Sequence, residues 1–113
     1  MKTTKSEAQF VSKFGINLWA YKTGSNKVGF VHTEVGEGHF EEFYHKKSTF
    51  IYYILEGEGI FFLDGVKTPV KATDLLVIPP NTKIYYFGKM KLNLITVPAW
   101  DSSEEVHVRN IEK

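Results

Sequence analysis

Short apolar runs rich in β-branched and aromatic residues recur about every ten residues along this chain, with turn residues between them. The run at 28–35 ends at Gly36-Glu37-Gly38, and the run at 75–78 ends at Pro79-Pro80-Asn81. Glycine, proline and asparagine favour turns, whereas β-branched and aromatic side chains favour strands. No helix-patterned segment of about ten or more residues separates the runs, which disfavours an α/β fold. The spacing is therefore typical of an all-β sandwich or barrel.

The strand runs and their turns can be placed along the chain. Asp64-Gly65 predicts a type I′ hairpin turn, because that turn needs positive φ at both central residues. Near the N-terminus, Ser6 and Gln9 have the spacing of a weak capping box, so 6–14 is expected to form a short helix that Gly15 ends. The expected strands lie at 16–21, 28–35, 50–55, 60–63, 66–70, 75–78, 84–87 and 92–97.

Length and charge narrow the class of protein. A chain of 113 residues is expected to form one domain, with 1–15 as an extension or short helix, 16–100 as a barrel and 101–113 as a charged tail or edge strand. The net charge of +1 argues against nucleic-acid binding, and no apolar run approaches the roughly 20 residues that cross a bilayer. No cysteine is present, which excludes thiolate sites. No hydrophobic region follows the basic start, so we read no signal peptide and expect a cytoplasmic protein.

Two segments together resemble the motifs of the cupin superfamily. Residues 45–59 (HKKSTFIYYILEGEG) are similar to the first motif, in which a His-x-His pair is followed by a Glu and then by a "YVLEGEG" strand and turn. Residues 73–84 (TDLLVIPPNTKI) are similar to the second motif, "GDLVVIPPGTPH". The resemblance implies an all-β fold, the RmlC-like double-stranded β-helix or jelly-roll barrel, often paired into a homodimer.

The metal site that the family uses is degenerate in this sequence. The resemblance places the four ligand positions at Phe43, His45, Phe50 and Ile84, and of these only His45 is a possible ligand. One imidazole does not hold a divalent cation, because such sites need several N or O ligands. We therefore expect no metal and no other cofactor at the family site.

A shifted metal site is an alternative. In an extended strand, side chains two residues apart share a face, so His39, Glu41 and His45 would point the same way as ligands for zinc, iron or manganese. Along a straight strand, His39 and His45 are too far apart to share an ion. The other interpretation is that His39, Glu41 and Glu42 belong to a solvated loop.

A pocket without a metal is the interpretation that we prefer. If the motif alignment holds, one imidazole, two phenols and three apolar side chains face the barrel interior, and they suit a small, partly apolar or ring-shaped ligand. The plain alternative is that the aromatic side chains fill the barrel. The expected inward residues are Phe43, His45, Phe50, Tyr52, Ile84 and Tyr86.

The superfamily also contains metal-independent sugar-nucleotide epimerases and isomerases that use a His and a Tyr as acid and base. The resemblance implies His45 as base and Tyr52 or Tyr86 as acid. Lysines that could meet a diphosphate lie near the expected mouth of the barrel. They are Lys46, Lys47 and Lys83.

The remaining histidines and outward aromatic residues are given structural roles. His32 is expected to be a surface or half-buried strand residue, and His107 a solvent-facing residue of the tail. Exposed aromatic side chains are common at subunit interfaces, so we expect an aromatic homodimer surface. Its members would be Tyr53, Tyr85, Phe10, Trp19 and Tyr21.

Three hypotheses about function follow. The first is a cupin that binds a small molecule in a metal-free pocket around His45, Tyr52 and Tyr86. The second is a metal-independent sugar or sugar-nucleotide isomerase or epimerase with the same residues. The third is a metal-dependent enzyme with the shifted site. Whether the protein is an enzyme is left open by the sequence.

Overall fold

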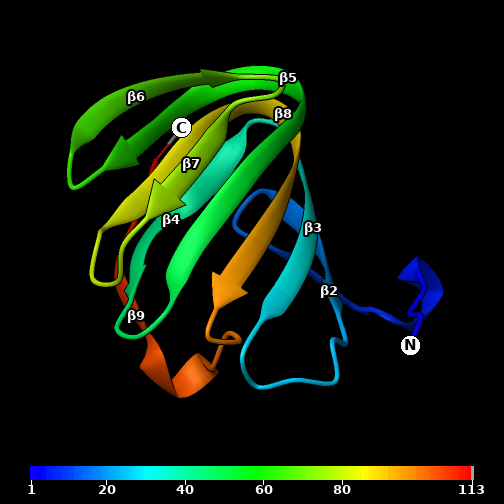
Figure 1. The fold of residues 1–113 in the computed structure, drawn as a ribbon. Helices are drawn as coiled ribbons and strands as arrows, with labels where there is room; N and C mark the ends of the chain where they lie inside the picture. The colour runs from blue at the N-terminus through cyan, green and yellow to red at the C-terminus, as the bar shows by residue number, and fades with distance from the viewer. Residues whose placement is uncertain (113) are drawn as a thin grey trace.

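Nine strands and two short 3₁₀ helices make up residues 1–112, the part of the chain that the computed structural model describes (Figure 1). Lys113, the last residue of the expected domain, lies outside the described residues. The helices are η1 (Lys5–Glu7) and η2 (Ser102–Glu104). The strands are β1 (Gln9–Lys13), β2 (Ile16–Tyr21), β3 (Gly29–Val35), β4 (Gly38–His45), β5 (Thr49–Leu63), β6 (Val66–Lys71), β7 (Leu75–Ile78), β8 (Ile84–Val97) and β9 (Glu105–Asn110).

The strands form a curled antiparallel sheet around an apolar interior, as expected of an all-β barrel. The strand order is β1-β2-β3-β8-β4-β9, and β5 pairs with β6, β7 and β8. The two longest strands, β5 and β8, pair along almost their whole length and curve together across the molecule (Figure 1). Among residues 1–112, no helix has the length and apolar character needed to cross a bilayer.

A glycine bend joins runs that the sequence analysis separated. The runs expected at 50–55 and 60–63 are one strand, β5, and those at 84–87 and 92–97 are one strand, β8. The register of β5 on β8 shifts between Ile54 and Glu56, and Gly57 follows with φ +83°. A Cβ at Gly57 would collide with the carbonyl oxygen of Lys89 on β8. Glycine therefore bends the strand here without ending it.

The predicted hairpin is confirmed. Asp64 and Gly65 have φ values of 50° and 78°, the positive values that a type I′ turn needs at both central residues. The returning strand β6 pairs with the end of β5 from Leu63↔Val66 to Glu58↔Lys71.

The expected N-terminal helix is wrong beyond its first turn. Only Lys5–Glu7 is helical, and Gln9–Lys13 forms β1, which pairs with β2. Phe10 lies opposite Trp19 in this ladder, and their ring centroids are 5.0 Å apart. An isolated helix of this length has little intrinsic stability, whereas the edge of β2 offers backbone partners and an aromatic contact.

The segment from Gly38 to His45 is a strand rather than the solvated loop that was one expectation. It pairs with β8 on one side and β9 on the other, with register shifts along both ladders. His39, Glu41 and Glu42 are 4%, 6% and 6% exposed, so none is a solvated side chain. The C-terminal segment supplies the expected edge strand, β9.

Two edge strands from opposite ends of the chain meet across the opening of the curl. Lys13 Nζ at the end of β1 lies 4.0 Å from Glu105 Oε2 at the start of β9. Phe14 stacks on His107, with ring centroids 6.3 Å apart. Side-chain contacts, rather than a backbone ladder, therefore bring the first and the last strand together.

Candidate functional site

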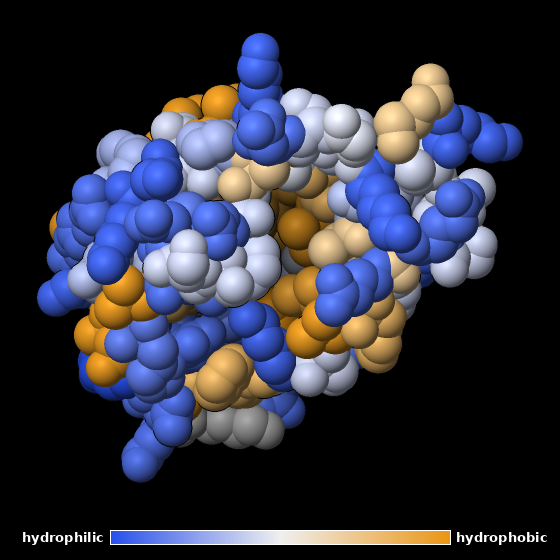
Figure 2. Space-filling view, turned by 90° about the horizontal axis from the view of Figure 1, so that it is seen from below, coloured by the Kyte–Doolittle hydropathy of each residue, from blue (hydrophilic) through white to orange (hydrophobic). Residues whose placement is uncertain are grey.

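The curled sheet encloses an open cavity of about 660 Å³. The view from below in Figure 2 shows an apolar hollow that polar residues surround. Strands β1, β2 and β3 form one wall, while β4, β5 and β8 contribute the other. The lining residues are Gln9, Val11, Lys13, Ile16, Leu18, Ala20, Tyr21, Lys22, Thr23, Gly24, Ser25, Val28, Gly29, Phe30, Val31, Thr33, His39, Phe43, Phe50, Tyr52, Tyr86, Leu94, Thr96, Ala99, Trp100 and Glu105.

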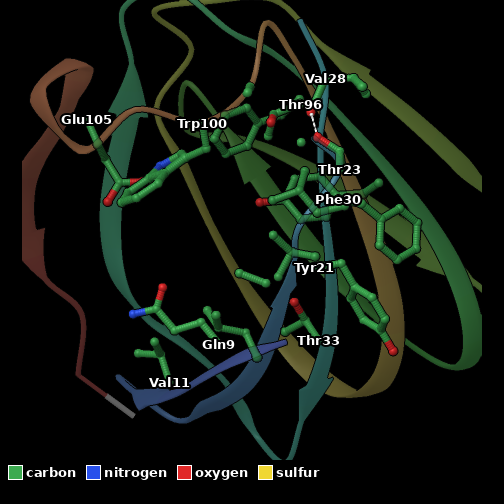
Figure 3. Close-up of a pocket in the computed structure, with 18 of the residues that line it drawn as sticks. Gln9, Val11, Tyr21, Thr23, Val28, Phe30, Thr33, Thr96, Trp100 and Glu105 are labelled. Atoms are coloured by element: carbon green, nitrogen blue, oxygen red, sulfur yellow. Dashed lines mark hydrogen bonds between the residues drawn. The ribbon is translucent and has the colours of Figure 1, made fainter. Parts of the chain in front are cut away.

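The mouth of the cavity is built from loops. One side is the connection between β2 and β3, where Thr23 Oγ1 donates to the carbonyl of Val28 over 2.7 Å (Figure 3). The other side follows β8 and carries Trp100, which is 45% exposed and donates from Nε1 to Glu105 Oε1 over 3.0 Å. The indole ring of Trp100 is therefore fixed at the mouth by its hydrogen bond to the carboxylate of Glu105.

The inner wall carries an imidazole and two phenols. The ring centroids of His39 and Tyr86 are 5.4 Å apart, and those of Tyr86 and Tyr52 are 6.0 Å apart. Phe43 and Phe50 border the same space. Four of the six expected pocket residues thus line the cavity, and His39 joins them.

The two phenols keep their protons. Burial raises the pKa of Tyr52 well above its usual range, and nearby Tyr86 and Glu105 raise it further. Burial likewise raises the pKa of Tyr86 well above its usual range. At neutral pH both hydroxyls are therefore hydrogen-bond donors at the cavity wall.

Two expected pocket residues do not border the cavity. Ile84 packs in the core at 2% exposure. His45 sits at the end of β4, where its Nδ1 accepts from the backbone N–H of Ser48 over 2.9 Å and its Nε2 lies 3.1 Å from the carbonyl oxygen of Asp101. The ring is fixed by the turn that follows the strand. The expected pairing of His45 with Tyr52 or Tyr86 as base and acid is therefore not assembled.

The shifted metal site is not assembled either. Among residues 1–112, no three His, Asp or Glu side chains gather as ligands for a metal ion. His39 Nε2 lies 3.5 Å from Glu41 Oε1, but His45 remains with its turn. The other oxygen of Glu41 pairs with His107 instead, at 2.7 Å from Nδ1.

The neighbouring Glu42 has a different partner. Arg109 Nε donates to Glu42 Oε1 over 2.9 Å, and its guanidinium lies over the ring of Tyr85. The hydrogen bond and charge of Glu42 raise the pKa of Arg109. Glu41 and Glu42 thus serve separate clusters, although they are adjacent in sequence and buried to the same extent.

None of the lysines expected at the mouth, Lys46, Lys47 and Lys83, lines the cavity. Lys47 pairs with Glu104 over 3.6 Å, and the lysines that line the cavity are Lys13 and Lys22. His32, expected on a strand surface, lies 3.0 Å from Asn93 Oδ1 through Nδ1 and is partly buried. His107 is 49% exposed, as expected of a tail residue, yet it contacts Glu41.

Several lining residues were missed. Gln9, Val11 and Lys13 alternate along β1, a period-two signal that the short capping pattern obscured. Trp100 is the last residue of the expected barrel segment, and Glu105 lies in the segment expected to be a charged tail or edge strand. Nothing local in the sequence indicates that these two ends of the chain meet at one cavity.

Comparisons with known proteins point to a family and to one group of relatives. The family model for the cupin domain matches residues 29–88. A variant of PAC13 from Streptomyces, solved with uridine, is 39% identical, with a TM-score of 0.96 over 98% of this chain and 92% of that one. Pac13 is described as a unique nucleoside dehydratase in a structure that matches 99% of this chain and 93% of that one, at the same identity and TM-score.

Two further matches are weaker, one in identity and the other in coverage. KdgF from Halomonas sp. is 17% identical, with a TM-score of 0.75 over 88% of this chain and 94% of that one, a similarity of fold alone. An uncharacterized protein of Methanocaldococcus jannaschii, MJ1618, is 45% identical over 53 residues. That match spans 45% of this chain and 42% of the curated relative, less than half of either.

Proposed function

This chain belongs to the cupin family, and from that premise we propose that its cavity binds a uridine-like nucleoside and that the protein is a nucleoside dehydratase. The proposal keeps the preferred sequence interpretation, a metal-free aromatic pocket for a small molecule. It assigns the imidazole of that pocket to His39 instead of His45.

One observation carries the proposal. The Streptomyces relative was solved with uridine in three variants, one with His replaced by Gln and two with Tyr replaced by Phe, at positions 13 and 34 residues apart along that chain. In this chain His39, Tyr52 and Tyr86 have the same spacings. All three border one cavity here.

The cavity has the size and lining that a nucleoside needs. Its volume of about 660 Å³ lies in the range of small-molecule sites, roughly 300–1,000 Å³. The indole of Trp100 at the mouth offers an aromatic face that suits a planar base. The hydroxyls of Tyr52, Tyr86 and Thr33 and the carboxylate of Glu105 suit the polar edges of a sugar and a base.

The three polar side chains match the needs of an elimination of water. A C–H bond and a C–O bond on adjacent carbons break, a C=C bond forms, and a base takes the proton while an acid protonates the leaving hydroxyl. An imidazole exchanges protons near neutral pH, so we assign the base to His39. A protonated phenol, Tyr52 or Tyr86, is the acid. The imidazolium then returns its proton to the phenolate, so the step needs no oxidant.

The first test is binding. Uridine added to the ¹⁵N-labelled protein should shift the indole signal of Trp100 and the imidazole signals of His39, and should leave those of the outward-facing His32 in place. If uridine shifts none of the cavity signals, nucleoside binding is ruled out.

The second test is turnover. Uridine and derivatives with a carbonyl on the sugar, which acidifies the neighbouring C–H, are incubated with the protein, and mass spectrometry detects a product lighter by one water. His39→Gln, Tyr52→Phe and Tyr86→Phe should slow the reaction by roughly 10²–10⁴-fold. The matched control Tyr53→Phe, on the exposed face of β5, should leave it unchanged.

The pH profile of turnover is a further prediction. Because the pKa values of Tyr52 and Tyr86 are raised, both phenols stay protonated beyond the ordinary tyrosine pKa of 10.0, so their ionisation should not lower the rate up to that pH.

A further inference from the structure

The imidazole of His39 is enclosed and lacks a close hydrogen bond. Its ring is surrounded by Phe14, Phe43 and Tyr86, at centroid distances of 6.1, 5.2 and 5.4 Å. Neither ring nitrogen has a hydrogen-bond partner among residues 1–112. The nearest charged group is Glu41, whose Oε1 lies 3.5 Å from His39 Nε2 and is itself without a hydrogen bond. The separation is a few tenths of an ångström longer than a typical hydrogen bond, so Glu41 is the group placed to accept a proton carried on Nε2.

Glu41 is held as a carboxylate at this place. Its side chain is 8% exposed, and Oε2 lies 2.7 Å from His107 Nδ1. Burial acts to raise the pKa of Glu41, but contacts with His39 and His107 and the charge of Lys13 outweigh it and leave the pKa lowered. An ionised carboxylate only accepts hydrogen bonds, so it favours a proton on the nitrogen that faces it.

His107 holds Glu41 from the solvent side. It comes from β9, opposite Phe43 on β4, and its ring is stacked against Phe14 and 49% exposed. The pairing of the C-terminal strand with β4 thus completes a row that runs from solvent through His107 and Glu41 to His39 at the cavity.

We propose that Glu41 is a positioning residue that holds His39 in the tautomer with its proton on Nε2, which leaves the lone pair on Nδ1 as the base. His107 fixes the carboxylate in turn. A carboxylate that orients the imidazole of a base is a recurring device, because the wrong tautomer offers a proton where a lone pair is needed. The catalytic consequence rests on the proposed function, whereas the tautomer is a property of the free protein.

The tautomer is measured directly. In ¹⁵N-labelled protein at the pH of the turnover assay, the nitrogen shifts of His39 should report a proton on Nε2 and a lone pair on Nδ1. In Glu41→Gln the amide offers a donor to Nε2, so the population of that tautomer should fall. The control is Glu42→Gln, an equally buried glutamate of the same strand that pairs with Arg109, and it should leave the His39 signals unchanged. An unchanged tautomer in Glu41→Gln overturns the proposal.

A second variant tests the same proposal in case Glu41→Gln does not fold. His107→Phe keeps an aromatic ring against Phe14 but removes the contact with Glu41. It should shift the His39 tautomer in the same direction by a smaller amount. If the tautomer of His39 is the same as in the wild type, the row from His107 to His39 has no positioning role.

The kinetic test separates this proposal from the proposed function. A base held in the wrong tautomer lacks the lone pair that takes the proton, so kcat of Glu41→Gln should fall by roughly tenfold or more while KM and uridine affinity stay unchanged. A purely structural role would instead lower stability and leave kcat of the folded protein intact. If the wild type binds and converts no nucleoside, the proposed function fails, and the tautomer measurement still decides the role of Glu41.

Discussion

The position of one histidine relative to a turn decides which imidazole reaches the cavity. The motif alignment placed His45 inside the barrel, but its ring accepts backbone N–H groups of the turn that follows β4, from Lys47 over 3.2 Å and from Ser48 over 2.9 Å. His39, six residues earlier, has no such local partner and borders the cavity.

His45→Ala should therefore destabilise the protein without removing a catalytic group. It leaves the N–H of buried Ser48 without its acceptor, which costs about 1–3 kcal/mol. Urea unfolding measures the loss. His39→Gln, which keeps a polar side chain of similar size at the cavity wall, is the comparison variant and should lose turnover. A stable His45→Ala protein that no longer converts nucleosides contradicts this assignment.

At the residue scale, the sequence placed the phenols and phenylalanines of the site but not its imidazole. Tyr52, Tyr86, Phe43 and Phe50 lie in or beside family motifs, so alternation within a strand was enough to point them inward. The sequence analysis considered His39 only as a metal ligand or as a residue of a solvated loop. Its burial depends on pairing of β4 with β8 and β9, which are distant in sequence.

At the scale of elements, three glycines allow two long strands to cross at close range. A Cβ at Gly57, Gly59 or Gly88 would collide with backbone of the facing strand. Because of this bend, β5 and β8 stay paired along the whole length of the barrel. Tyr52 and Tyr86, one on each strand, both line the cavity.

Gly57→Ala should lower the free energy of unfolding by more than the cost of placing a residue with a Cβ at positive φ. The conformation at φ +83° costs a residue with a Cβ about 1–2 kcal/mol, and the collision with Lys89 adds to it. Gly65→Ala is the matched control, because φ is +78° there and a Cβ meets nothing within 4 Å. Equal losses in the two variants, measured by urea unfolding, would show that the close approach of the strands adds no cost.

Element boundaries were predicted where turn residues end a strand and missed where they bend one. The strands at 16–21 and 75–78 were predicted with the bounds observed, since non-repetitive backbone follows each. Gly57 and Gly88 were taken as ends of strands, yet the ladder continues through both. Whether a glycine ends a strand or bends it depends on the strand that pairs with it, and the residues around the glycine do not reveal where that partner lies.

At the scale of the whole molecule, an apolar face remains exposed on the outside of the barrel. Tyr53 pairs directly with Leu75 across β5 and β7, and Val77 lies beside them. Their exposed fractions are 38%, 58% and 62%. Tyr85, also expected on such a surface, is instead covered by Phe62 at a centroid distance of 4.6 Å.

We propose that this face of β5 and β7 pairs two copies of the chain, because burying its apolar side chains stabilises association. Light scattering at micromolar concentration should give twice the chain mass of 13.0 kDa. Leu75→Lys with Val77→Lys should give a monomer that stays folded, and Lys67→Glu, on β6, should not alter the mass. A particle of the chain mass for the wild type excludes the dimer.

The meeting of the first and last strands at the cavity has a consequence for how ligand preference diverges among relatives. The segment that the family model matches, residues 29–88, holds the scaffold together with His39, Tyr52 and Tyr86. Much of the mouth and the outer wall comes from residues 9–28 and 94–105. Mutations in these two segments can therefore alter which molecule enters the cavity without disturbing the three residues to which we assign the chemistry. Two relatives with nearly identical central segments are free to evolve toward different substrates, so inheritance of the scaffold does not entail inheritance of the substrate.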